Sequence, residues 1–301
     1  ITMTITQQRE QLQNELNQRI KSGGSQNRLA KQLGINAGTL SFIKNAQWDN
    51  ISDQMVAKLR AQLRLDNWQL RATQNFNLIS KLCEDARTKH RFLAVAGYTG
   101  AGKTTALRHY ASRGRGCYYV LATVLHTKRT FLKDIQQSMG ISEGSTIAGM
   151  MMAIVRQLNK EHEPLLIIDD GGKLSDVCLR LLQVIYDSTE FHAGLILGGT
   201  EYLKKNMDKK ASKDVMGFRE LRRRVGYWLP LVAPNNGEIT QICKDYGITQ
   251  GPAIKYIISH CRDYGTLRNL ILNAVSVAQR GQQEVDRELL SGLLVGDEHY
   301  Q

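Results

Sequence analysis

The residues with the clearest chemistry are 97–104, which read GYTGAGKT and fit the pattern G-x-x-x-x-G-K-[ST]. An apolar run at 92–96 precedes them and predicts a buried strand, and residues 105–111 have the spacing of a helix. A glycine-rich turn between a strand and a helix lets backbone N–H groups surround phosphate oxygens, which the positive end of the helix also faces. The sequence therefore predicts a nucleoside triphosphate site.

Two side chains of this motif have roles of their own. Lys103 would reach the β- and γ-phosphates, and the hydroxyl of Thr104 would bind Mg²⁺. The predicted nucleotide-contacting residues of the motif are Gly97, Tyr98, Thr99, Gly100, Ala101, Gly102, Lys103, Thr104 and Thr105.

Carboxylates close a second apolar run, at 165–168. Asp169 and Asp170 follow it directly. An aspartate at a strand end beside a phosphate loop can hold the water shell of Mg²⁺, so we assign Asp169 to the metal. We expect Asp170 to orient or deprotonate the attacking water.

A third apolar run, at 193–197, ends at Gly198-Gly199-Thr200. A polar side chain at this place can sense the γ-phosphate or the attacking water. We assign Thr200 to this role and Glu201 as a weaker candidate. An ordinary strand-to-helix turn is the alternative.

The segment 204–224 is strongly basic, and a solvated charged face is the usual explanation of such a segment. The triplet Arg222-Arg223-Arg224 is placed where an arginine could reach the γ-phosphate of a neighbouring subunit. We predict that Arg223 or Arg224 is such a finger, with Arg222 the remaining candidate.

The expected elements define an α/β fold. The runs 92–96, 117–122, 165–168 and 193–197 are predicted strands, and helical patterns separate them, which indicates a parallel sheet. A glycine- and serine-containing loop is expected at 140–146.

A different pattern precedes this core. Leu29, Ala30 and Leu33 share one helical face, Gly34 turns the chain, and Leu40 begins a second apolar face. Two short helices joined by a glycine turn have helix-turn-helix geometry, which resembles that of phage repressor and Cro proteins. The resemblance implies a second helix in the major groove, and its side chains nearest the DNA would be Gln26, Asn36, Thr39, Ser41 and Lys44. A helical bundle that only docks protein is the alternative.

The totals agree with a DNA partner. The chain has 301 residues and a net charge of +12, which favours an anionic polymer as ligand. Its five cysteines form no C-x-x-C pair, so neither a disulfide framework nor a zinc site is indicated, and a cytoplasmic protein is expected. No apolar run reaches the roughly 18 residues of a membrane span, and the polar start does not resemble a signal peptide.

Together these motifs resemble AAA+ ATPases over about residues 76–294. With the helix-turn-helix in front, the arrangement is similar to the transposition helper ATPases of the phage Mu B protein (MuB) family, as are the phrases GAGKTTALRHYA, LLIIDD and GLILGGTEYL. The resemblance implies that Thr200 is sensor 1, that Arg223 or Arg224 is the arginine finger, and that Arg268 in Gly265-x-x-Arg268 is sensor 2 and contacts the nucleotide.

The resemblance also implies partners. Members of this family bind double-stranded DNA when loaded with ATP, assemble into helical filaments with nucleotide between subunits, mark target sites and stimulate a transposase. Loops of the channel contact DNA, and by position these contacts would be Lys128, Arg129, Ser145 and Thr146.

One departure from the family affects turnover. The acidic strand more often ends Asp-Glu, whereas here it ends Asp169-Asp170. The shorter side chain sits farther back, and a misplacement of about 1 Å can cost around 10²-fold in rate. We therefore expect slow hydrolysis, with ATP acting mainly as an assembly switch.

We expect three domains: a helix-turn-helix domain at 1–72, an α/β core at 73–235 and a helical lid at 236–301. Two other functions share the nucleotide motifs. A replication initiator or helicase loader more often carries its DNA-binding domain after the lid. A nucleotide-gated helix-turn-helix transcription regulator would bind one operator as a defined dimer.

Overall fold

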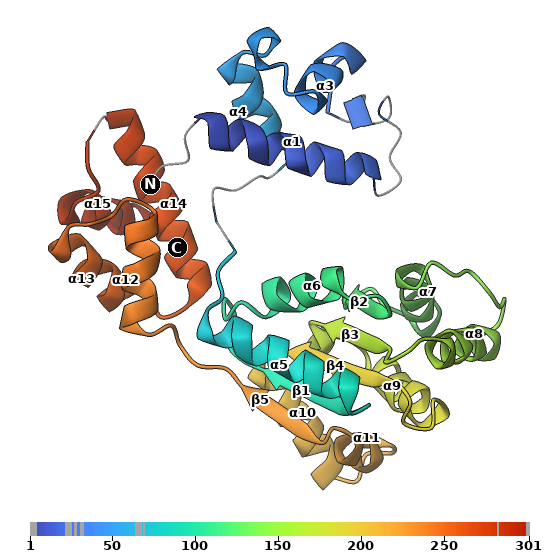
Figure 1. Ribbon diagram of the computed structural model, residues 1–301. Helices are drawn as coiled ribbons and strands as arrows, with labels where there is room; N and C mark the ends of the chain where they lie inside the picture. The colour runs from blue at the N-terminus through green and yellow to red at the C-terminus, as the bar shows by residue number, and fades with distance from the viewer. Residues whose placement is uncertain are drawn as a thin grey trace. The chain divides into compact units, whose positions relative to one another are not determined.

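The computed structural model describes residues 5–21, 26, 29–30, 33–63, 68, 70–281 and 283–298 (Figure 1). The chain divides into two compact units. The α/β unit comprises 71–239 and 258–267, and the helical unit comprises the described parts of 1–70, 240–257 and 268–301.

A parallel five-stranded sheet forms the centre of the α/β unit, in the order β2-β3-β4-β1-β5. Its strands are β1 (Phe92–Ala96), β2 (Cys117–Leu121), β3 (Leu165–Asp169), β4 (Gly194–Gly199) and β5 (Tyr227–Pro230). Every residue of β1, β3 and β4 is buried, because these three strands lie inside the sheet and helices cover both faces. The predicted α/β fold with a parallel sheet is confirmed.

The register brings the predicted chemistry to one edge. Ala96 at the end of β1 pairs with Gly199 at the end of β4, and Leu121 at the end of β2 pairs with Asp169. The segments that follow β1, β3 and β4 therefore start side by side, at the carboxyl ends of the strands, where open α/β sheets bind ligands.

Seven helices described in this unit flank the sheet (Figure 1): α5 (Gln74–Thr88), α6 (Lys103–Arg113), α7 (Lys128–Ser138), α8 (Ile147–Lys160), α9 (Asp176–Ser188), α10 (Glu201–Ser212) and α11 (Phe218–Arg224). Side chains of α5 and α6 join a core with Leu93 and Val95 of β1. Side chains of α7 to α11 join a second core with Phe92, Ala94 and Ala96. Alternate residues of β1 thus supply opposite faces, as the two-residue period of a strand requires.

The basic segment 204–224 folds into α10 and α11, for which the sequence reasoning predicted no helices. Leu203 and Met207 are buried one turn apart and attach α10 to the core. Lys204 Nζ pairs with Asp208 Oδ2 at 2.7 Å, an i,i+4 pair on the outer side. The buried side chains of Leu203 and Met207 therefore stabilise a helix in a segment that is mostly charged.

The first part of the helical unit contains α1 (Ile5–Lys21), α3 (Ala37–Lys44), the 3₁₀ turn η1 (Trp48–Asn50) and α4 (Asp53–Gln62). Leu12, Leu16, Leu40 and Ile43 are fully buried in its core. Asn36 caps α3, because its Oδ1 accepts the Thr39 N–H at 2.6 Å. The first helix of the predicted helix-turn-helix lies largely outside the described residues, so that motif stays a prediction.

The described residues from 236 onward are mainly helical, with α12 (Asn236–Asp245), α13 (Gly251–His260), α14 (Tyr264–Gly281) and α15 (Arg287–Glu298). Residues 258–267 belong to the α/β unit, so the two observed units do not test the three predicted domains. Within the part of the chain that the structure describes, no helix is both long and apolar enough to span a bilayer.

Candidate functional site

The loop between β1 and α6 has an open backbone cradle. Gly100 and Gly102 have φ values of +84° and +85°, in the left-handed region that favours glycine. Gly102 is the N-cap of α6 and supplies no side-chain acceptor, so the first N–H groups of the helix lack a side-chain cap. A Cβ on Gly102 would meet no atom within 4 Å. The loop therefore offers donors and space to an anion, and this fits a phosphate group.

The back of the loop is tightly held. The N–H of Tyr264 donates to the Gly100 carbonyl at 3.1 Å. A Cβ on Gly100 would lie 2.1 Å from Asp263 Oδ1, so only glycine fits there. Residues 263–264 thus support the loop at Gly100.

Lys103 lies inside the loop rather than in solvent. Its side chain is 7% exposed, and Nζ donates to the carbonyls of Gly97 at 2.9 Å and Tyr98 at 2.7 Å. Burial lowers the pKa of Lys103, and the negative charges of Asp169 and Asp170 oppose that shift. The ammonium group is therefore poised between loop carbonyls and strand-end carboxylates, where the terminal phosphates of a nucleotide would be held.

Asp169 is fully buried at the end of β3, and both of its oxygens are engaged. Oδ2 accepts the Tyr119 hydroxyl at 2.9 Å, and Oδ1 accepts the Asp170 N–H at 2.8 Å. Burial raises the pKa of Tyr119, as does the charge of Asp169, so the phenol remains a donor. Arg108 Nε in turn donates to the Tyr119 oxygen at 3.1 Å. A fixed carboxylate at this edge suits Mg²⁺, which keeps several waters and takes one or two carboxylate contacts.

Asp170 begins the 3₁₀ turn η2 (Gly171–Lys173) in a left-handed conformation, with φ of +55°. Its Oδ2 pairs with Lys173 Nζ at 2.8 Å. Such backbone conformations are uncommon outside glycine and cluster at functional sites. Thr200 lies at the neighbouring strand end, as the N-cap residue of α10, and its side chain makes no capping bond.

The three arginines of α11 differ in their partners. Arg222 pairs with Asp208, and Arg224 Nε lies 2.6 Å from Asp187 Oδ1. Arg223 is exposed, and no described residue pairs with it. It is the arginine of the triplet that is available to a second molecule.

Sequence reasoning missed two supporting residues. Asn75 is fully buried on α5, where its amide donates to the Val232 carbonyl at 2.8 Å and to the Ala101 carbonyl at 3.2 Å. Nothing in the local sequence distinguishes it from other helical asparagines. Tyr119 was missed because its contact with Asp169 crosses from β2 to β3, and the sequence does not state which strands are neighbours.

The predicted DNA-contacting residues lie away from this loop in sequence, and each is placed as follows. Thr39 and Ser41 on α3 are half-buried, as is Gln26 earlier in the chain, whereas Asn36 and Lys44 at the two ends of α3 are exposed. Ser145 and Thr146 are exposed before α8, and Thr146 Oγ1 caps that helix by accepting the Gly149 N–H at 3.0 Å. Arg268, which was predicted to contact the nucleotide and not DNA, is half-buried on α14 in the helical unit. All of these roles stay predictions.

Lys128 and Arg129 were expected in a loop but lie in the first turn of α7, where both are exposed. The helix starts early because Thr127 and Thr130 form a reciprocal capping box. Their predicted contact with DNA is not tested by this placement.

The chain is similar to known proteins in sequence and in fold. Residues 83–207 match the family described as AAA domain. The Mu-like prophage FluMu DNA transposition protein B of Haemophilus influenzae is 26% identical over 273 residues, which cover 87% of this chain and 93% of that protein. The ORC2 protein of Aeropyrum pernix, solved as ADPNP–ADP complexes, superposes with a TM-score of 0.55 at 14% identity and covers 75% of this chain and 68% of its own. This last likeness is one of fold alone.

Proposed function

We propose that the chain is an AAA+ ATPase related to Mu-like prophage DNA transposition protein B, and that it binds duplex DNA in an ATP-dependent and sequence-tolerant manner. In this proposal ATP-loaded copies assemble into a filament on DNA, select the target and activate a transposase. The single observation that carries the proposal is the open phosphate cradle beside a buried, hydrogen-bonded aspartate, in a chain related to a transposition protein along most of its length.

Each residue of the site has its own role at the nucleotide. Bound ATP and Mg²⁺ would supply the phosphoanhydride and the charge that neutralises its oxygens. The loop N–H groups and Lys103 bind the phosphates, and Thr104 and Asp169 orient the metal. Asp170 holds the water that attacks, and Thr200 lies at the adjacent strand end to sense the outcome. Because the Asp170 side chain is short and paired with Lys173, we expect slow turnover.

A nucleotide site that is shared between two copies of the chain couples ATP binding to assembly. Arg222 and Arg224 are held by carboxylates of their own chain, so Arg223 is our choice for the finger that reaches the next copy. A site completed only across a boundary between copies forms only when ATP brings the copies together. This coupling makes ATP an assembly switch.

Assembly also explains how weak contacts hold DNA. The net charge of +12 supplies phosphate contacts, each of which releases counterions, so binding should weaken steeply with salt. Many copies on one polymer turn modest affinity per copy into avid binding without base readout.

Electron microscopy on random duplex DNA tests the proposal. We expect filaments with ATP and with a non-hydrolysable analogue, similar lifetimes in both, and bare DNA with ADP. Lys103→Ala serves as the control that cannot load nucleotide, and it should leave DNA bare in every condition. Discrete particles on one preferred sequence would instead support an initiator or a transcription regulator.

A further inference from the structure

The turn between β2 and α7 carries two exposed aliphatic side chains at its tip. Val124 is 77% exposed and Leu125 is 83% exposed. The central positions of turns usually hold glycine, proline, asparagine, aspartate or serine. A single exposed aliphatic residue is ordinary. Here two adjacent aliphatic side chains are both exposed, and the geometry of the turn does not favour either residue type.

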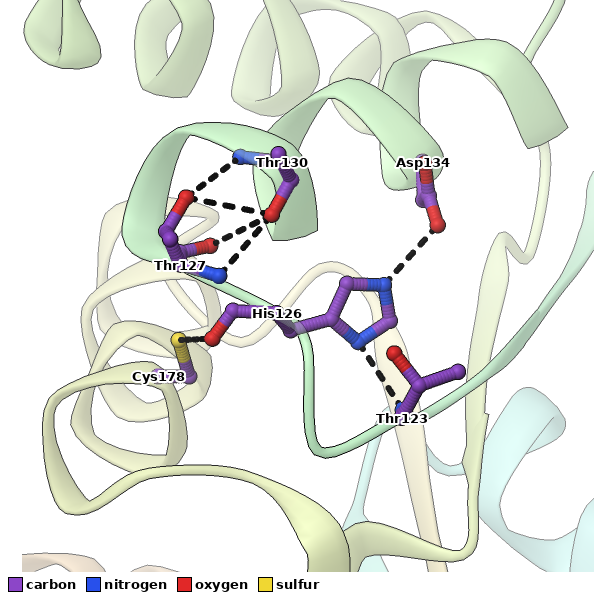
Figure 2. A network of polar contacts seen from close by, with 6 residues as sticks. All are labelled: Thr123, His126, Thr127, Thr130, Asp134 and Cys178. Atoms are coloured by element: carbon purple, nitrogen blue, oxygen red, sulfur yellow. Dashed lines mark hydrogen bonds and ion pairs between the residues drawn. The ribbon is translucent and has the colours of Figure 1, made fainter.

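The turn is held by a buried histidine (Figure 2). The His126 N–H donates to the Thr123 carbonyl at 3.3 Å, and Nδ1 of the same residue accepts the Thr123 N–H at 3.0 Å. Since a backbone N–H can only donate, Nδ1 is the acceptor and a neutral ring carries its proton on Nε2. Nε2 then donates to Asp134 Oδ2 at 2.9 Å.

These contacts make the tip rigid. The His126 side chain is 5% exposed, its ring lies 5.5 Å from that of Phe131, and the Cys178 thiol lies 3.9 Å from its carbonyl oxygen. The turn is therefore anchored to α7 and α9 on one side of the exposed pair. A contact surface ordered in advance loses little conformational entropy when it binds.

The charge beside the tip favours an anionic partner. Lys128 and Arg129 follow on the first turn of α7, both are exposed, and no described residue pairs with either. The Thr127–Thr130 capping box leaves these two side chains free of a capping role. Two free cations next to an apolar tip suit a ligand with anionic groups flanking an apolar surface, and a duplex DNA groove is such a ligand.

We propose that Val124 and Leu125 form an apolar tip that enters a groove of duplex DNA while Lys128 and Arg129 bind the flanking phosphates, with His126 as the positioning residue. This inference rests on the proposed DNA-binding function and adds a contact that does not depend on charge. Apolar contact releases no counterions, so it can be separated from the phosphate contacts by its salt dependence.

The test measures affinity for a random duplex by fluorescence anisotropy, with the ATP analogue, from about 50 to 200 mM salt. For the double variant Val124→Ser and Leu125→Ser we expect roughly tenfold weaker binding at every salt concentration, with an unchanged slope of log K against log salt. The matched control Lys128→Ala should instead lower that slope by about one. Both changes are at exposed positions, so thermal unfolding should stay as in the wild type.

Three results would overturn the inference. The double serine variant could bind as the wild type does, or it could change the slope as Lys128→Ala does. It could also lose nucleotide-dependent self-association without DNA, measured by light scattering, and the tip would then pack against another copy. A wild-type protein that fails to bind duplex with nucleotide would overturn the proposed function itself, which separates that failure from the others.

Discussion

At the scale of single residues, the carboxylate that we propose as the metal ligand is hydrogen-bonded to a neighbour from another strand. Asp169 was predicted from its place after an apolar run, and it lies at the expected strand end. Its Tyr119 partner comes from β2, whose position beside β3 the sequence does not state. Strand order is a long-range property, and residues that act across it are missed by local patterns.

We expect Tyr119→Phe to raise the Mg²⁺ concentration needed for half-maximal ATP hydrolysis by about tenfold, because Asp169 Oδ2 loses the donor that orients it. Titration of Mg²⁺ at saturating ATP measures this. Tyr118→Phe is the matched control, since it also removes a hydroxyl that donates to a carboxylate, that of Glu161 at 2.9 Å. Equal Mg²⁺ requirements in the two variants would rule out an orienting role for Tyr119.

At the scale of elements, predictability follows burial. β1, β3 and β4 are continuous apolar runs buried at every residue, so their sequences predict them well. β5 has four residues with exposed ends and was not predicted, because a short edge strand has no distinct pattern. The two buried apolar residues of α10, Leu203 and Met207, are surrounded by lysines in the sequence, so their helical spacing was not recognised.

The start of α7 shows why a helix cap can be missed in the sequence. A capping box is usually read from a Ser or Thr followed by Glu or Gln three residues later, whereas here threonine occupies both positions. The reciprocal bonds between Thr127 and Thr130 start the helix at Lys128, and the turn before it is correspondingly short.

The two hydrogen bonds of His126 can be separated by substitution. His126→Asn keeps an acceptor near the position of Nδ1 for the Thr123 N–H, and His126→Gln keeps a donor near Nε2 for Asp134. Because the Thr123 bond closes the turn directly, we expect the Asn variant to retain more DNA affinity than the Gln variant at equal thermal stability. Anisotropy and thermal melts measure both. If the Gln variant bound DNA as tightly as the wild type, the hydrogen bond between His126 and Thr123 would not be needed to hold the turn.

At the scale of the whole molecule, the sequence indicates a basic chain with a nucleotide site but not how the chain is partitioned. Residues 258–267 join the α/β unit because Tyr264 binds the Gly100 carbonyl and Asp263 fills the space beside that glycine. Neither contact has a local signature. The phosphate loop therefore contacts residues 263–264, which belong to the same unit.

The central claim is that a nucleotide site is completed by a second copy of the chain, and mixing two inactive variants tests it most directly. The Lys103→Ala variant lacks the side chain that binds the phosphates but keeps Arg223. The Arg223→Ala variant keeps Lys103 but lacks the arginine that reaches the next copy. Each alone should lose about 10³-fold or more of the DNA-stimulated ATP turnover. Arg219→Ala, which removes an exposed arginine paired with Asp214, is the control and should be active. We predict that an equal mixture of the two inactive variants recovers turnover well above their sum, whereas a mixture that stays at the sum would contradict a site shared between copies.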